Sequence, residues 1–172
     1  RIKPIPSSRP MNACVIIPCY NHSGTVAPVA RAALDHVPVI VVDDGSTRPL
    51  SPIPGAVLLR LERNSGKGAA LRAGFHRALD LGHTHAISLD ADGQLAPDDL
   101  PRFLDATRGD ERALVVGVRD FSAAGAPPIR HATNLLSNLL VRLETGLRLA
   151  DTQCGYRSYP IASSLALPTR SP

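Results

Sequence analysis

Residues 37–46 read VPVIVVDDGS and residues 85–94 read HAISLDADGQ, and each segment joins an apolar run to a cluster of acids and glycine. A short apolar run that stops at such a cluster is typical of a buried strand followed by a turn. Comparable runs predict further strands at residues 13–17, 56–61 and 113–118. The sequence therefore predicts five strands, and two of them end in carboxylates.

Helical patterns fill the intervals between these strands. Apolar residues recur at helical spacing over residues 24–35, from the glycine-rich segment 64–68 to about residue 81, and over residues 129–145 before Gly146. Pro97, Asp98 and Asp99 form a typical helix start. The alternation predicts one α/β domain with a mostly parallel sheet covered on both faces. Because such sheets bind ligands beyond the carboxyl ends of their strands, both acidic clusters should line one crevice.

Composition narrows the classes of function. The 172 residues are 44% hydrophobic but only 3% aromatic, which predicts an aliphatic core and argues against global disorder. A net charge of +4 and a pI near 9.3, without a run of like charges, suit an anionic ligand and do not indicate nucleic-acid binding. Three cysteines without a CxxC spacing predict reduced thiols in a cytosolic protein. No apolar stretch is long enough to span a bilayer.

The acidic clusters are the strongest chemical signal. Asp90 and Asp92 follow a predicted strand, and their carboxylates, with the Gln94 amide oxygen, could hold a hard divalent cation. Asp43 and Asp44 follow another strand and could accept hydrogen bonds from a ribose hydroxyl or a base N–H. Acids and glycine are also ordinary turn residues, so each cluster alone fits a solvated turn equally well. Two such turns at the ends of two strands of one sheet favour a binding site.

The segment NSGKG at residues 64–68 precedes a predicted helix. Glycines let the backbone approach a ligand, the start of a helix favours anions, and Lys67 adds positive charge. The segment is not a P-loop, because Leu61 stands where that pattern needs glycine and Gly68 where it needs serine or threonine. An ATPase is therefore disfavoured.

The order of these segments resembles family 2 glycosyltransferases of the GT-A fold. The motifs are VIIPCYN at 15–21, VVDDGS at 41–46, NSGKG at 64–68 and DADGQ at 90–94. Further on, VGVR at 116–119 and DTQCGYR at 151–157 are similar to the dolichol- and polyprenyl-phosphate mannose synthases of that family. The resemblance implies a GT-A-like three-layer α/β sandwich around a central, mostly parallel sheet.

The resemblance also implies an activity. A metal-dependent, inverting enzyme would move a hexose from GDP- or UDP-hexose to a polyprenyl phosphate or another glycan or lipid acceptor. Mg²⁺ or Mn²⁺ would be held by Asp90, Asp92 and Gln94. The expected nucleotide-sugar contacts are Pro18, Tyr20, Asn21, Asp43, Asp44, Lys67, Asp90 and Arg119, with Asp43 in a supporting role. The expected catalytic residues are Asp92, Asp151 and Arg157.

Two of these roles have alternatives. Arg119 and Arg157 would bind phosphate of either the donor or the acceptor, for which guanidinium groups are suited. Asp151 would be the general base for a hydroxyl acceptor, or an acid that orients Arg157 or caps a turn. His22 stands where the family often has glutamate, so the identity of the donor's nucleobase stays open.

The expected organisation is a disordered leader at residues 1–12, a glycosyltransferase core at 13–160 and a tail at 161–172. By the resemblance, that tail is expected to be cut short before the family's last strand and helix. A polyprenyl acceptor implies a place in the cytoplasm or, as a peripheral protein, at the inner face of the cell membrane.

Two other classes stay open. One is a nucleotidyltransferase of similar fold, which would be expected to carry arginine in the loop after the first strand, where this chain has YNHSG at 20–24. The other is a non-catalytic nucleotide-sugar-binding module.

Overall fold

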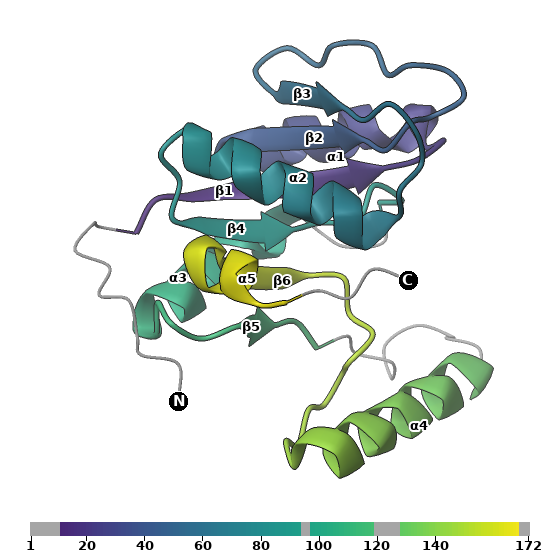
Figure 1. Ribbon diagram of the computed structural model, residues 1–172, viewed down its shortest axis with the longest axis vertical. Helices are drawn as coiled ribbons and strands as arrows, with labels where there is room; N and C mark the ends of the chain where they lie inside the picture. The colour runs from purple at the N-terminus through teal and green to yellow at the C-terminus, as the bar shows by residue number, and fades with distance from the viewer. Residues whose placement is uncertain (1–10, 94–96, 119–127, 169–172) are drawn as a thin grey trace.

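A computed structural model describes residues 11–93, 97–118 and 128–168, and within them one six-stranded sheet forms the centre of the molecule (Figure 1). The strand order is β3-β2-β1-β4-β6-β5. The bounds are β1 (Ala13–Cys19), β2 (Val39–Asp43), β3 (Val57–Arg60), β4 (His85–Ser88), β5 (Val115–Val116) and β6 (Arg157–Pro160). Strands β1 to β4 run parallel, whereas β6 is antiparallel to β4 and to β5. The predicted mostly parallel sheet is confirmed.

Helices cover both faces of this sheet. Helices α1 (Ser23–Leu34) and α3 (Leu100–Gly109) pack on one face, and a 3₁₀ turn, η1 (Pro97–Asp99), leads into α3. Helices α2 (Lys67–Asp80) and α5 (Ile161–Ala166) pack on the other face. In Figure 1, α2 lies in front of the sheet and α1 behind it. The three-layer α/β sandwich expected from the sequence is confirmed.

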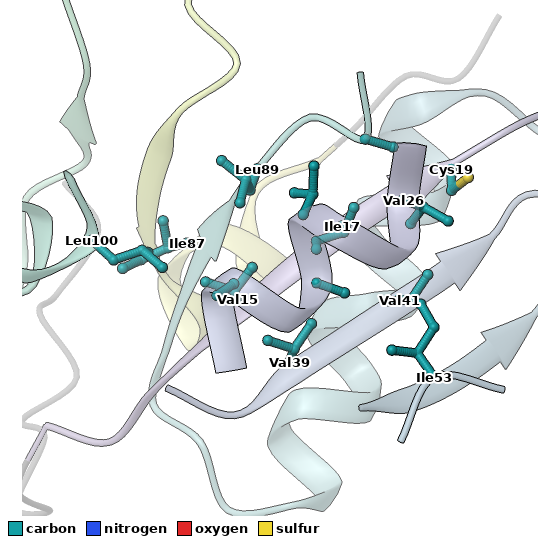
Figure 2. Packing of buried hydrophobic residues seen from close by; sticks show 14 of the residues in the cluster. Val15, Ile17, Cys19, Val26, Val39, Val41, Ile53, Ile87, Leu89 and Leu100 are labelled. Carbon is teal, nitrogen blue, oxygen red and sulfur yellow. The ribbon is translucent and has the colours of Figure 1, made fainter. Parts of the chain in front are cut away.

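The core is aliphatic and lies on both sides of β1. Val15, Ile17 and Cys19 face the α1 side, while Cys14 and Ile16 face the α2 side, because successive side chains of a strand alternate. Figure 2 shows side chains of adjacent strands gathered beneath the helix that carries Val26. A strand covered on both faces must be apolar throughout, which is why β1 reads as a continuous apolar run. The three cysteines are free and buried, and burial raises the pKa of the Cys14 thiol to about 12.

Two structural elements were missed from the sequence. Strand β6 reads RSYP, which has no apolar run, and it owes its strand conformation to pairing with β4 and β5. Helix α5 follows directly, and Ile161 at its start is fully buried. The packed core therefore continues past residue 160, where the sequence reading placed its end.

The start of the chain also differs from the expected disordered leader over residues 1–12, of which residues 1–10 lie outside the described part. Asn12 is held firmly to the turn before β4. Its backbone N–H donates to Thr84 Oγ1 at 2.9 Å, and its carbonyl accepts from the Thr84 N–H at 2.8 Å. Its side chain contacts the Gly82 carbonyl and the His83 ring. Asn12 therefore belongs to the folded domain.

Helix α4 (Pro128–Thr145) stands apart from the sheet (Figure 1). It ends as predicted at Gly146, whose φ of 74° is in the left-handed region and whose N–H donates to the Arg142 carbonyl at 2.9 Å. Several leucines along it are exposed: Leu135, Leu136, Leu139, Leu140 and Leu143. Within the described parts of the chain, no helix combines the length and the apolar character needed to cross a membrane.

Candidate active site

A pocket of about 270 Å³ opens at the carboxyl ends of β1 and β2. Strand order reverses between β1 and β4, because β2 lies on one side of β1 and β4 on the other, and such reversals are where α/β sheets bind ligands. The lining residues are Pro18, Cys19, Tyr20, Asp44, Asn64, Gly66 and Lys67. Segments far apart in the sequence thus meet here, and four of the predicted donor contacts are among them: Pro18, Tyr20, Asp44 and Lys67.

Asp44 holds the loop that forms one wall of this pocket. Its Oδ1 accepts from the Ser65 N–H and its Oδ2 from the Gly66 N–H, both at 2.9 Å. The loop crosses directly over Gly45, where a Cβ would stand 2.3 Å from the Arg63 carbonyl carbon. Glycine at this position therefore lets the loop come close enough for Asp44 to bind it just before α2 begins.

Asp43 is fully buried, and its carboxylate binds groups inside the protein. Its carboxylate accepts from the Ser46 N–H at 2.9 Å and the Leu50 N–H at 3.2 Å, and it forms an ion pair with Arg60. Burial alone would raise the pKa of Asp43, but the hydrogen bonds from Ser46, Leu50 and Arg60 outweigh burial and hold it below its usual range. The structure thus places Asp43 among buried contacts and not among the residues that line the pocket.

Asn21 joins the end of β1 to the loop after β2. Its N–H donates to Ser46 Oγ and its side-chain oxygen accepts from the Thr47 N–H, both at 3.0 Å. Its φ of 58° is in the left-handed region, which asparagine tolerates better than most residues. Asn21 is not among the lining residues, and its hydrogen bonds instead join the two loops beside the pocket.

Asp90 follows β4 at the edge of the pocket. Its Oδ1 forms an ion pair with the Lys67 ammonium, which places a positive charge where the sequence predicts a metal. Asp92 is exposed on the turn that follows, and Thr25 Oγ1 fixes this turn to α1 by donating to the Ala91 carbonyl at 2.6 Å. Gln94, the third predicted metal ligand, lies outside the described residues.

Gly155 lies directly against the Asp90 carboxylate. A Cβ on Gly155 would stand 2.1 Å from Asp90 Oδ2, closer than any real contact. Ser88 Oγ donates to the Gly155 carbonyl at 2.6 Å and so fixes this approach. The segment 151–157 is thereby joined to the acidic end of β4, as one site built from two distant motifs.

Arg157 and Asp151 organise this second segment. The Arg157 guanidinium donates to the Cys154 carbonyl from Nε at 2.8 Å and to the Thr152 carbonyl from a terminal nitrogen at 2.6 Å. Asp151 is buried, and its Oδ1 accepts from the Gln153 N–H at 3.0 Å, which is the turn-capping alternative predicted from the sequence. Arg119, the other predicted phosphate ligand, lies outside the described residues.

The described residues contain no group of three or more His, Cys, Asp or Glu side chains that could hold a metal ion. A cation bound at Asp90 and Asp92 would therefore need further oxygen ligands.

A family model described as "Glycosyl transferase family 2" matches residues 14–164, which is most of the chain. The chain belongs to glycosyl transferase family 2. The family resemblance stated from the sequence motifs is thus confirmed.

Within this family the chain is similar to undecaprenyl-phosphate mannosyltransferase of Micrococcus luteus, at 33% identity over 87% of this chain and 66% of the relative. It is also similar to polyprenol monophosphomannose synthase of Mycolicibacterium smegmatis, at 31% identity over 84% of this chain and 60% of the relative. The chain therefore spans about two thirds of these relatives or less.

A solved structure has a similar fold. Glucosyl-3-phosphoglycerate synthase of Mycobacterium tuberculosis, crystallised with Mn²⁺, UDP and glucosyl-3-phosphoglycerate, superposes with a TM-score of 0.67. The alignment covers 88% of this chain and 57% of that one, at 21% identity. At this identity the likeness establishes the fold.

Three residues in or beside this pocket had no role predicted from the sequence. Cys19 and Asn64 line the pocket although no role was assigned to them, and Gly155 was quoted only as part of a motif. Both had a usable signal, because Cys19 lies between the predicted contacts Pro18 and Tyr20, and Asn64 belongs to the same NSGKG motif as Lys67. The contact of Gly155 with Asp90 had none, since it depends on how β6 pairs with β4.

Proposed function

We propose that this chain is the donor-binding core of a glycosyltransferase that moves a hexose from GDP- or UDP-hexose to a polyprenyl phosphate or another glycan or lipid acceptor. The observation that carries the proposal is the pocket at the carboxyl ends of β1 and β2, beside the Asp90 carboxylate. The polyprenyl-phosphate transferases among its relatives support the acceptor class.

The pocket has features suited to a nucleoside diphosphate. Pro18 and Tyr20 offer apolar surface for a planar base, and Tyr20 is 42% exposed at the rim. Gly66 and Lys67 place the start of α2 at the opposite wall, where the helix dipole and the lysine charge favour a diphosphate. Asp44 keeps this wall in place through the Ser65 and Gly66 amides.

Asp90 and Asp92 would hold a divalent cation together with Gln94. The residues fit this role because carboxylates are the ligands that Mg²⁺ and Mn²⁺ prefer, and because Asp90 already accepts a cation, the Lys67 ammonium. The diphosphate oxygens of the donor would complete the ligand set. When bound, the cation would supply positive charge that stabilises the departing diphosphate.

On the acceptor side, a phosphate is already ionised and needs no general base. Attack on the face of the sugar opposite the diphosphate would invert the anomeric centre. Asp151 is only 1% exposed, so it would serve a hydroxyl acceptor poorly as a base and instead fixes the segment that carries Arg157. Arg157, with Arg119, would contribute positive charge near the reacting phosphates.

Peripheral membrane contact is part of the proposal. The exposed leucines of α4 offer apolar surface, and Asn138 ties this helix to the chain just before the segment 151–157 by donating to the Ala150 carbonyl at 2.8 Å. A protein of this kind would work in the cytoplasm or at the inner face of the cell membrane.

The test is transfer of labelled hexose from GDP-mannose or UDP-glucose to a short polyprenyl phosphate in detergent, with Mn²⁺ or with EDTA. We expect a labelled lipid product that requires the cation and is lost in Asp92→Asn. Asp98→Asn, an exposed acid at the start of η1, is the matched control and should retain activity. Donor binding without any product would favour the non-catalytic module, and formation of a nucleotide–acceptor diphosphate would favour the nucleotidyltransferase.

A further inference from the structure

We propose that Lys67 is an internal counter-ion of Asp90 that lowers the affinity of the donor-free protein for divalent cations, and that the donor's diphosphate releases this restraint. The inference deepens the proposed function and rests on it. Its consequence is that the cation binds weakly to the free protein and tightly only together with the nucleotide.

The position of Lys67 is the first step. Its side chain lines the pocket and its ammonium contacts Asp90 Oδ1. Gly155 lies against the same carboxylate, where a Cβ would stand 2.1 Å from Oδ2 and 2.8 Å from Oδ1. Lys67 contacts Oδ1, the oxygen less closely covered by Gly155, so a cation at this carboxylate must compete with the ammonium.

The strength of the ion pair is the second step. The Lys67 and Asp90 side chains are 50% and 30% exposed, and ion pairs this open to water are weak. A divalent cation can therefore displace the ammonium. Its affinity is reduced, however, by the loss of the ion pair and by the repulsion between the cation and the displaced ammonium. Lysine has a flexible four-carbon stem, which lets the displaced ammonium move without unfolding α2.

The diphosphate is the third step. It brings enough negative charge to satisfy both the cation at Asp90 and the ammonium at the start of α2, so the repulsion between them is screened. Cation and nucleotide should then bind cooperatively, and each should raise the affinity for the other by the same factor. Lys67 would sense whether the donor is present.

The test uses Mn²⁺ alone as the probe, followed by electron paramagnetic resonance of the free ion, on the nucleotide-free protein. Lys67→Met removes the charge and keeps the length of the side chain, so we expect Mn²⁺ to bind about three- to fivefold more tightly, the size of an exposed ion pair. Lys67→Arg keeps the charge and should stay within about twofold of the wild type. Unchanged or weaker binding in Lys67→Met, or equal tightening in both variants, would overturn the inference.

A second arm separates this inference from the proposed function. Asp90→Asn should abolish Mn²⁺ binding; if it does not, the metal site itself is wrong and both proposals fall. If Asp90→Asn abolishes binding but Lys67→Met does not strengthen it, only the role of Lys67 falls. With UDP or GDP present, the wild type should gain more Mn²⁺ affinity than Lys67→Met, and an equal gain would contradict the release by diphosphate.

Discussion

Gly155 packs so closely on Asp90 that a Cβ on the glycine would stand 2.1 Å from Asp90 Oδ2. This contact joins two motifs that are far apart in the sequence, the acidic end of β4 and the segment that enters β6. Because Ser88 anchors the Gly155 carbonyl, the carboxylate has little room on that side. The orientation of a predicted metal ligand is thus set by a residue from another motif.

Replacing Gly155 with alanine should displace the Asp90 carboxylate. The methyl group would meet the end of a side chain that can move, so we expect a stability loss of only about 1 kcal/mol. Mn²⁺ affinity should fall on the order of tenfold, as for other changes that disturb the support of a metal ligand. Gly109→Ala is the matched control, because a Cβ there meets nothing within 4 Å. Unchanged Mn²⁺ binding in Gly155→Ala would contradict the account.

Asp44→Asn should loosen the loop before α2. An asparagine can accept only one of the two amide hydrogen bonds, from Ser65 or Gly66, and its NH₂ group would oppose the other. We expect a loss of about 1.5–3 kcal/mol in the free energy of unfolding, measured in urea, together with weaker nucleotide binding. Asp80→Asn, at the exposed end of α2, should change stability by less than about 0.5 kcal/mol. Equal stability losses in the two variants would argue against the role of Asp44.

The buried Asp43 predicts a loss of stability in acid. Its pKa is lower in the folded protein than in the unfolded chain, so its contribution is complete above about pH 5 and is lost as pH falls through the folded pKa. Arg60→Gln removes one cause of the lowered pKa. The variant should be less stable at pH 7, and the difference from wild type should narrow as pH falls below about 4. Urea unfolding across this range gives the comparison, and a constant difference would refute the prediction.

Arg157→Lys should destabilise the segment 151–157. Lysine keeps the charge but cannot reach the Cys154 and Thr152 carbonyls with a planar fork. We expect a loss of about 1–2 kcal/mol in stability, from two hydrogen bonds made by a charged group. Thermal unfolding measures this loss. A variant as stable as the wild type would mean that Arg157 has no organising role.

Most of the sheet could be predicted from the sequence. Strands β1, β2 and β4 are buried on both faces, so they read as apolar runs that end in the residues of the pocket. Strand β6 could not be predicted, because RSYP carries no apolar pattern and is a strand only by pairing. Strand β5 was predicted over residues 113–118 but pairs only at Val115 and Val116.

The site was predicted in part. Pro18, Tyr20, Asp44 and Lys67 meet in one pocket because the carboxyl ends of parallel strands share one edge. The sequence could not distinguish a residue that faces the pocket from one that supports it. Asp43 and Asn21 belong to the second kind, since their hydrogen bonds run to neighbouring loops.

The most direct test of the donor site is calorimetric titration of UDP and of GDP into the protein, with Mn²⁺ and then with EDTA, for the wild type and Asp92→Ala. The account predicts that one of the two nucleotides binds with Mn²⁺, that EDTA weakens this binding strongly, and that Asp92→Ala does the same. If neither nucleotide binds to the folded protein, or if binding is the same with EDTA and in Asp92→Ala, the pocket is not a metal-dependent donor site.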